Sequence, residues 1–293
     1  TVWDEAVKLQ SADNDFHRRD LFESIEAGDF PEWELSVQLF TDEDAQDFPF
    51  DHLDPTKLIP EELIPLQPVG RMVLNRWPDN FFAETEQVAF CPANVPPGID
   101  FSNDPLLQGR LFSYLDTQLS RLGGPNFAQI PINAPKCPFH HMQRDGHMQM
   151  QVPKGRVNYE PSSLQADSPR ASQALGFRHF AQADDGVKGR VRAESFADHY
   201  SQARMFYRSQ SPLEQAHLAS ATVFELSKVG TPHVREAVVG HLQHVDAELA
   251  QRVADGLGMQ ALPPAPPTVE PVQDLPLSPA LRIIDRMKPT LQG

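Results

Sequence analysis

The residues with the clearest chemical potential are a tyrosine and two arginines in the middle of the chain. Residues 109–123 read Gly-Arg-Leu-Phe-Ser-Tyr-Leu-Asp-Thr-Gln-Leu-Ser-Arg-Leu-Gly. On a helix, four of these side chains share one face because they fall at i, i+4, i+8 and i+11, namely Arg110, Tyr114, Gln118 and Arg121. An arginine one turn from a tyrosine in a poorly hydrated site favours the phenolate. A phenolate is a hard, anionic oxygen ligand that suits ferric iron.

The second arginine extends this interpretation, and a plainer one stands beside it. Arg121 lies farther along the same face and could pair with a carboxylate at the edge of a flat cofactor. Arg110 and Tyr114 could equally form a cation–π or packing pair on the surface of the helix. Spacing alone leaves both interpretations open.

The tyrosine requires a helix to carry it, and the local sequence predicts one. Asn103-Asp-Pro opens a helix over 104–122, and Gly123-Gly124-Pro125 closes it. Two short helices are predicted within 4–28, ending at Gly28. Strands are predicted at 33–39, 69–75 and 85–90.

The second half of the chain alternates between irregular and helical sequence. Residues 125–210 are predicted to be long and irregular, and 211–258 to form three helices. Ser211-Pro212-Leu-Glu214 is a capping-box arrangement at the first of these helices. Seven prolines fall in the seventeen residues 263–279, which is the composition of a linker.

The overall composition narrows the class of protein. The 293 residues carry 25 Lys plus Arg against 40 Asp plus Glu, a net charge of −15, which disfavours nucleic acids and anionic membrane surfaces as partners. No apolar run approaches the ~20 residues that span a bilayer. Two cysteines, Cys91 and Cys137, fit a reducing compartment. We therefore expect a soluble, globular protein of the cytoplasm.

Several segments together resemble the monofunctional haem catalases, most of all their large-subunit branch. The resemblance covers about residues 1–260 and rests on these segments: Asp54-Pro-Thr-Lys-Leu-Ile-Pro60, Pro68-Val-Gly-Arg-Met-Val-Leu-Asn-Arg76, Asn80-Phe-Phe-Ala-Glu84, Pro97-Gly98, Arg110 to Gly123, Gly124-Pro-Asn-Phe127 and Ile130-Pro-Ile-Asn133. The segment from Arg110 to Gly123 matches the family's proximal haem signature, which makes the resemblance highly specific.

The resemblance implies roles for the residues of the shared face. Tyr114 would be the axial ligand of the haem iron, with Arg110 hydrogen-bonded to its oxygen. Arg121 would contact a haem propionate or lie near one, and Gln118 stands where other branches carry a histidine. The implied substrate is hydrogen peroxide, converted to water and dioxygen, and the implied assembly is a homotetramer.

The resemblance also implies the fold. We expect an α+β protein that contains part of an antiparallel β-barrel. The expected organisation is a partial haem-barrel domain with the proximal helix at 1–124, a wrapping arm at 125–210, a helical domain at 211–260 and a Pro-rich linker toward a further domain at 261–293.

The family's distal pair, a His that shuttles the peroxide proton and an Asn that orients the peroxide, has no matching motif here. We therefore expect that the chain begins after those residues and carries only the proximal side. Two other functions stay open: a catalase-related haem peroxygenase or allene-oxide-forming enzyme, and an inactive structural fragment.

Other candidate residues receive structural interpretations. Cys91 is expected to be a buried small hydrophobe. His140, His141 and His147 match no standard metal-site spacing, and His241 with His244 fits a solvated helical face. The acidic run 42–44 is expected to be a solvated turn.

Overall fold

The computed structural model describes residues 3–136, 144–156, 162–164, 174, 178–180, 189–191 and 194–283. The chain divides into two compact units. The first unit comprises Thr1–Asn75 and Gly189–Gly293, and the second comprises Arg76–Lys188. None of the described helices is long and apolar enough to cross a membrane.

The first unit begins with two helices and a small sheet. Helices α1 (Trp3–Ala12) and α2 (Phe16–Ala27) match the two predicted near the start, and α2 ends at Gly28 with a φ of 80°. Strands β1 (Glu32–Val37) and β2 (Gln67–Val73) pair antiparallel, with an irregularity between Leu35 and Ser36. Both strands confirm the predictions at 33–39 and 69–75. The described residues form this one two-stranded sheet and no barrel.

Two local predictions were wrong. Residues 85–90 are not a strand, because η1 (Phe82–Glu86) occupies their start. Asn80 lies just before that turn. Its side-chain oxygen accepts from the Ala83 backbone amide at 3.1 Å, and its backbone amide donates to the Glu84 carboxylate at 2.8 Å. The acidic run 42–44 is not a turn but most of a short helix, α3 (Asp42–Gln46).

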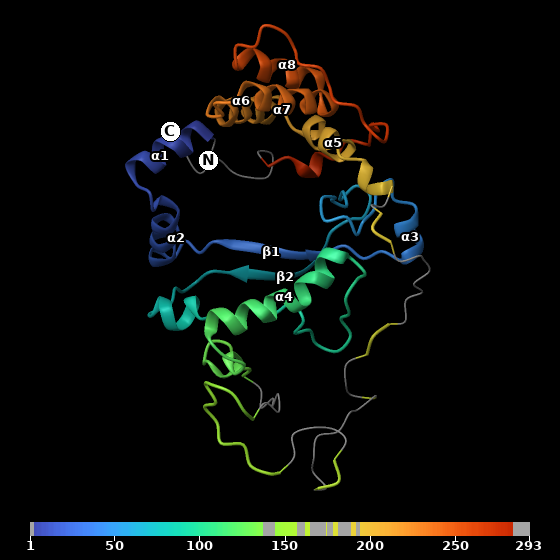
Figure 1. Cartoon of the computed structure of the whole chain (residues 1–293). Coiled ribbons are helices and arrows are strands. Elements are labelled where there is room, and N and C mark those ends of the chain that lie inside the picture. Colours follow the sequence, from blue (N-terminus) through green and yellow to red (C-terminus); the bar gives the residue numbers. More distant parts are fainter. Residues whose placement is uncertain are drawn as a thin grey trace. The chain divides into compact units, whose positions relative to one another are not determined.

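A helical bundle contains the main apolar core of the first unit. Helices α6 (Pro212–Ser227), α7 (Pro232–Val245) and α8 (Ala247–Gly256) confirm the three predicted helices, and Figure 1 shows them together. Val239, Leu249 and Val253 are almost fully buried between them. The predicted capping box at Ser211 and Glu214 is present. The bundle is held mainly by apolar burial.

Helix α5 (Ser201–Ser209) lies within the region predicted to be irregular. The pattern was missed because α5 is short and buries two serines, Ser201 and Ser209, as well as Met205 and Tyr207. A buried serine normally weakens an apolar pattern, but here each hydroxyl has a partner from the proline-rich segment.

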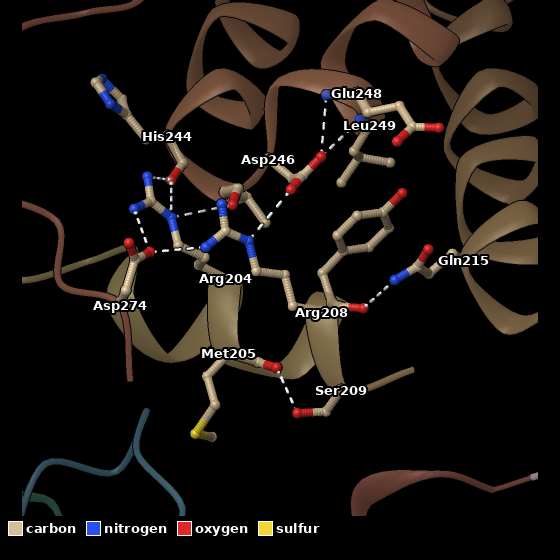
Figure 2. A network of polar contacts seen from close by, with 12 residues as sticks. Arg204, Met205, Arg208, Ser209, Gln215, His244, Asp246, Glu248, Leu249 and Asp274 are labelled. Atoms are coloured by element: carbon tan, nitrogen blue, oxygen red, sulfur yellow. Dashed lines mark hydrogen bonds and ion pairs between the residues drawn. The ribbon is translucent and has the colours of Figure 1, made fainter. Parts of the chain in front are cut away.

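The proline-rich segment is bound to α5, and near its start also to α7 through Gln243 and His244. Ser201 and Ser209 each accept a backbone amide from it, those of Gln273 and Ser278, both at 2.8 Å. Figure 2 shows Arg204 and Arg208 both bonded to Asp274, at 2.9 and 2.7 Å. The Arg204 hydrogen bond holds the pKa of Asp274 below its usual value. A segment with the composition of a linker is therefore bonded along the helices. We call residues 263–283 the strap.

Gly240 on α7 allows the strap to approach closely, and the Gly240→Ala variant tests this contact. A Cβ at this position would lie 2.7 Å from the Pro264 carbonyl oxygen, so the strap must shift. We expect the Gln273 amide to exchange its hydrogen about tenfold faster. Hydrogen exchange is the suitable measurement, because alanine itself favours a helix and obscures a loss of stability.

The matched control is Gly230→Ala, where an added Cβ meets nothing within 4 Å. This variant should leave exchange in the strap unchanged. Equal exchange rates in both variants would show that contact at Gly240 does not hold the strap.

Candidate functional site

Helix α4 (Pro105–Leu122) carries the predicted face and confirms the helix expected at 104–122. It begins at Asp104, whose side chain accepts a hydrogen bond from the Leu106 amide at 2.8 Å, and Pro105 occupies its first turn. It ends at Gly123, which adopts a φ of 85°. Arg121 in the last turn is placed favourably against the negative end of the helix dipole.

The two halves of the predicted face differ in burial and in hydrogen bonding. Arg110 is exposed and Tyr114 is half-buried, and within the described part of the chain neither side chain forms a hydrogen bond. Gln118 is 5% exposed and is bonded to Arg121. The four residues therefore share a helix, but only the second pair is joined directly.

Gln118 and Arg121 hold the backbone of a neighbouring segment. The Gln118 amide donates to the Phe90 carbonyl at 3.2 Å, and its oxygen accepts from Arg121 Nε and Nη2 at 3.2 and 3.0 Å. Arg121 Nη1 donates to the Glu86 carbonyl at 2.7 Å, and Nη2 donates to the Val88 carbonyl. Among the described residues, these bonds leave one Nη1 hydrogen of the guanidinium without a partner, out of its five N–H groups.

Asn133 is a site residue to which sequence reasoning gave no role. Its amide donates to the carbonyls of Gln87 at 2.8 Å and Phe127 at 3.2 Å. Its oxygen accepts from the Ala89 amide at 2.8 Å. The only sequence signal was its place in the segment Ile130-Pro-Ile-Asn133, which carries part of the family resemblance.

The open half of α4 fits a flat cofactor that contains a metal. Tyr114 offers an oxygen donor that has no partner in the described residues, and Arg110 offers a cation one turn away. Two apolar side chains, Leu107 and Leu111, lie on the same face as Tyr114 at i−7 and i−3 and are half-buried. Other large apolar side chains of α4 are exposed at other angles around the helix, namely Leu106, Phe112, Leu115 and Leu119. Haem needs an axial ligand and apolar contact along its rings, and these residue types provide both.

A separate pocket of about 660 Å³ lies at the far end of α4. Arg121 and Leu122 line it together with Phe82, Ile130 and Met148. Tyr114 and Arg110 are not among its lining residues. The pocket is therefore not the place where Tyr114 would meet a cofactor.

The remaining candidate residues have structural partners or lie elsewhere. Burial raises the pKa of the half-buried Cys91 thiol, which keeps it neutral at pH 7. His241 Nδ1 lies 2.6 Å from the Tyr200 hydroxyl, and His244 Nε2 donates to the Pro266 carbonyl at 2.6 Å.

Two of the weaker metal candidates, His140 and His141, fall outside the described residues, as does Cys137. Among the described residues, no group of three or more His, Cys, Asp and Glu side chains could hold a metal ion. A metal centre built from those residue types is therefore not found in the described part, whereas Tyr114 belongs to a different class of ligand.

Two family models match the chain. The model described as Catalase matches residues 1–166, which include α4, and the model described as Catalase-related immune-responsive matches residues 193–257, which include most of the helical bundle. The first match covers more than half of the chain. The chain belongs to the catalase family.

The relatives are catalases of the large-subunit type. The chain is 61% identical to catalase C of Rhizobium meliloti (strain 1021), over all of this chain and 41% of the relative. It is 57% identical to catalase HPII of Pseudomonas putida, over 89% of this chain and 37% of the relative. It is 52% identical to catalase-B of Dictyostelium discoideum, over 96% of this chain and 41% of the relative. The chain thus spans about two fifths of the length of these relatives.

Proposed function

We propose that the full-length protein containing this chain is a haem catalase that converts hydrogen peroxide to water and dioxygen. In this proposal, residues 1–293 supply the proximal side of the haem. The observation that carries the proposal is the position of Arg110 one turn from Tyr114 on one face of α4, in a chain of the catalase family; the Tyr114 hydroxyl has no partner among the described residues. The identity of 61% to a catalase over the whole chain supports it.

When bound, haem supplies the redox chemistry by which one peroxide is reduced to water and a second is oxidised to dioxygen. Tyr114 would hold the iron through its phenolate oxygen. Arg110, one turn away on the same face of α4, would donate a hydrogen bond to that oxygen. In the described residues, Arg121 keeps one Nη1 hydrogen and Gln118 keeps one Nε2 hydrogen without a partner, and the Arg121 hydrogen would bind a cofactor carboxylate.

The assembly and location are further parts of this proposal. The family resemblance supports a homotetramer, and the exposed apolar side chains on α4 are the kind of surface that other protein covers. A reducing location such as the cytoplasm agrees with the unpaired Cys91.

A comparison of two peroxide substrates tests the proposed function. We expect the purified full-length protein to release dioxygen from hydrogen peroxide and to consume a fatty-acid hydroperoxide much more slowly. An oxygen electrode measures the first reaction, and loss of the hydroperoxide measures the second. A preference for the fatty-acid hydroperoxide would instead indicate a peroxygenase or allene-oxide-forming enzyme.

The 293-residue chain by itself is the matched comparison in the same assay. We expect it to hold haem weakly and to show little turnover, since the proposed reaction needs a distal His and Asn, and no motif of residues 1–293 matches them. Vigorous release of dioxygen by this chain would contradict the division of roles that we propose.

A further inference from the structure

Residues 86–90 in the second unit have backbone groups that are hydrogen-bonded by side chains. A neighbouring strand would bind such groups in a sheet. The carbonyls of Glu86 and Val88 accept from Arg121, and that of Phe90 accepts from Gln118. Asn133 binds the two residues between them, through the Gln87 carbonyl and the Ala89 amide. We call these three side chains and the segment 86–90 the backbone clamp.

The clamp has two sides that alternate along the segment. Gln118 and Arg121 come from the last two turns of α4 and take every second carbonyl, at residues 86, 88 and 90. Asn133 comes from beyond η2 (Phe127–Gln129) and takes the positions between. Side chains from two different parts of the chain thus bind alternate residues of the segment.

Asn133 uses its full donor capacity in this arrangement. One Nδ2 hydrogen goes to Gln87 and the other to the Phe127 carbonyl, so the same amide ties the segment to η2. Its oxygen accepts the Ala89 amide at 2.8 Å. A side chain with both donors and its acceptor engaged specifies one conformation of the backbone that it binds.

The clamp bears on Tyr114 through the rigidity of the helix. Gln118 lies one turn after Tyr114 on the same face, and Arg121 lies nearly one turn further. A helix gripped at these two positions cannot rotate about its axis or slide without breaking the bonds to segment 86–90. The direction of Tyr114 is thereby coupled to the conformation of that segment.

We propose that Asn133 is a positioning residue for Tyr114: it holds segment 86–90 in the shape that Gln118 and Arg121 grip, and so fixes the rotation of α4. This inference rests on the proposed function only in its last step, the meeting of Tyr114 with the iron. The clamp itself does not depend on a cofactor. Catalytic geometry tolerates displacements of well under ~1 Å. A small rotation of α4 would therefore be enough to move Tyr114 out of position, although Asn133 does not contact it.

Asn133→Asp and Asn126→Asp form a matched pair of variants that tests this role. The first keeps the size and the acceptor of Asn133 but places an oxygen against the carbonyls of Gln87 and Phe127. The control has the same chemistry, because Asn126 is fully buried and its Nδ2 faces the carbonyls of 145, 146 and 147. None of the hydrogen bonds of its side chain, including the one that its oxygen accepts from Gln129 Nε2, involves segment 86–90.

Two measurements separate the clamp from its effect on the site. In the chain without cofactor, the Ala89 amide should exchange about tenfold faster in Asn133→Asp and at an unchanged rate in Asn126→Asp. In the haem-loaded full-length protein, the phenolate-to-iron charge-transfer absorption should shift or weaken in Asn133→Asp only. Asn133→Ser removes the amide without adding charge and gives the same test where the aspartate variant does not fold.

The possible outcomes are distinct. Unchanged Ala89 exchange in Asn133→Asp would overturn the clamp, and equal spectral changes in both variants would show that Asn133 has no special effect on Tyr114. A wild-type protein that binds haem without phenolate absorption would contradict the proposed function and the positioning role together. In that case the exchange result alone would still report whether the clamp exists.

Discussion

The Tyr114→Phe variant of the full-length protein is expected to lose peroxide turnover by about a hundredfold or more. Phenylalanine keeps the ring but removes the oxygen that we propose as the iron ligand. Tyr114 has no hydrogen bond in the described part of the chain, so the substitution breaks no bond of the protein itself. Dioxygen release from hydrogen peroxide measures the loss, and the folded fraction should stay near that of the unsubstituted protein.

Tyr200→Phe is the control for this prediction. Tyr200 is also a half-buried tyrosine, but its hydroxyl lies 2.6 Å from His241 Nδ1 in the first unit. Removing that hydroxyl should cost some stability and leave the absorption spectrum of bound haem unchanged. If Tyr114→Phe keeps full turnover under the same conditions, Tyr114 is not the ligand.

The Lys57→Met variant is expected to lower the free energy of unfolding by about 3 kcal/mol. Lys57 and Asp54 form an ion pair at 3.1 Å, and their side chains are only 7% and 6% exposed. Removing the ammonium leaves the carboxylate of Asp54 buried without its cation, and that desolvation is the main cost. Denaturant unfolding of the two proteins gives the difference directly.

An exposed pair gives the comparison for this loss. Arg18 and Asp15 lie within 2.5 Å, but their side chains are 82% and 56% exposed. Arg18→Met should change the unfolding free energy by less than the error of the measurement, because exposed ion pairs contribute little. A similar loss in both variants would show that burial does not set the value of the Asp54–Lys57 pair.

The loss in Lys57→Met should also depend on pH. Burial by itself would raise the pKa of Asp54, but hydrogen bonds from the Thr56 amide and hydroxyl and the contact with Lys57 outweigh it and leave the pKa lowered. The contribution of Asp54 is therefore fully present above its unfolded pKa of about 3.9 and disappears as the pH falls through the folded value. The two proteins should converge in stability in acid, and a constant difference down to pH ~2 would contradict this account.

The parts of the fold that could be predicted are those specified by adjacent residues. Asp104 and Gly123 define both ends of α4, and Ser211 with Glu214 begins α6, because caps act within a single turn. The strand at 33–39 was predicted from the alternation of apolar and polar residues, and the strand at 69–75 from a short apolar run. Local chemistry therefore accounts for most of the helices and for both strands of the sheet.

The features that the sequence did not predict depend on contacts between residues that are far apart in the chain. Segment 86–90 has the apolar content of a strand, but its backbone partners are Arg121 and Asn133, which lie more than thirty residues away. The composition of the strap predicts a linker toward a further domain, which stays a prediction, but it does not reveal that buried serines on α5 bind this segment from about seventy residues away. A local pattern carries no information about such partners.

The candidate site divides in the same way. Arg110 and Tyr114 could be found from a short motif because the motif is local. The role of Asn133 could not be found, since it exists only where η2 and segment 86–90 meet. The resemblance predicts that Arg121 contacts a haem propionate or lies near one, and this stays a prediction. The structure adds bonds from Arg121 to the Glu86 and Val88 carbonyls that no motif indicates.

The central claim is that the phenolate of Tyr114 binds the haem iron, and resonance Raman spectroscopy tests it most directly. The full-length ferric protein, prepared with ring-deuterated tyrosine, is excited in the phenolate-to-iron charge-transfer absorption. We predict phenolate ring modes that shift with the deuterium label, persist in Tyr200→Phe and vanish in Tyr114→Phe. Modes that persist in Tyr114→Phe, or a wild-type spectrum without any label-sensitive mode, would contradict the claim.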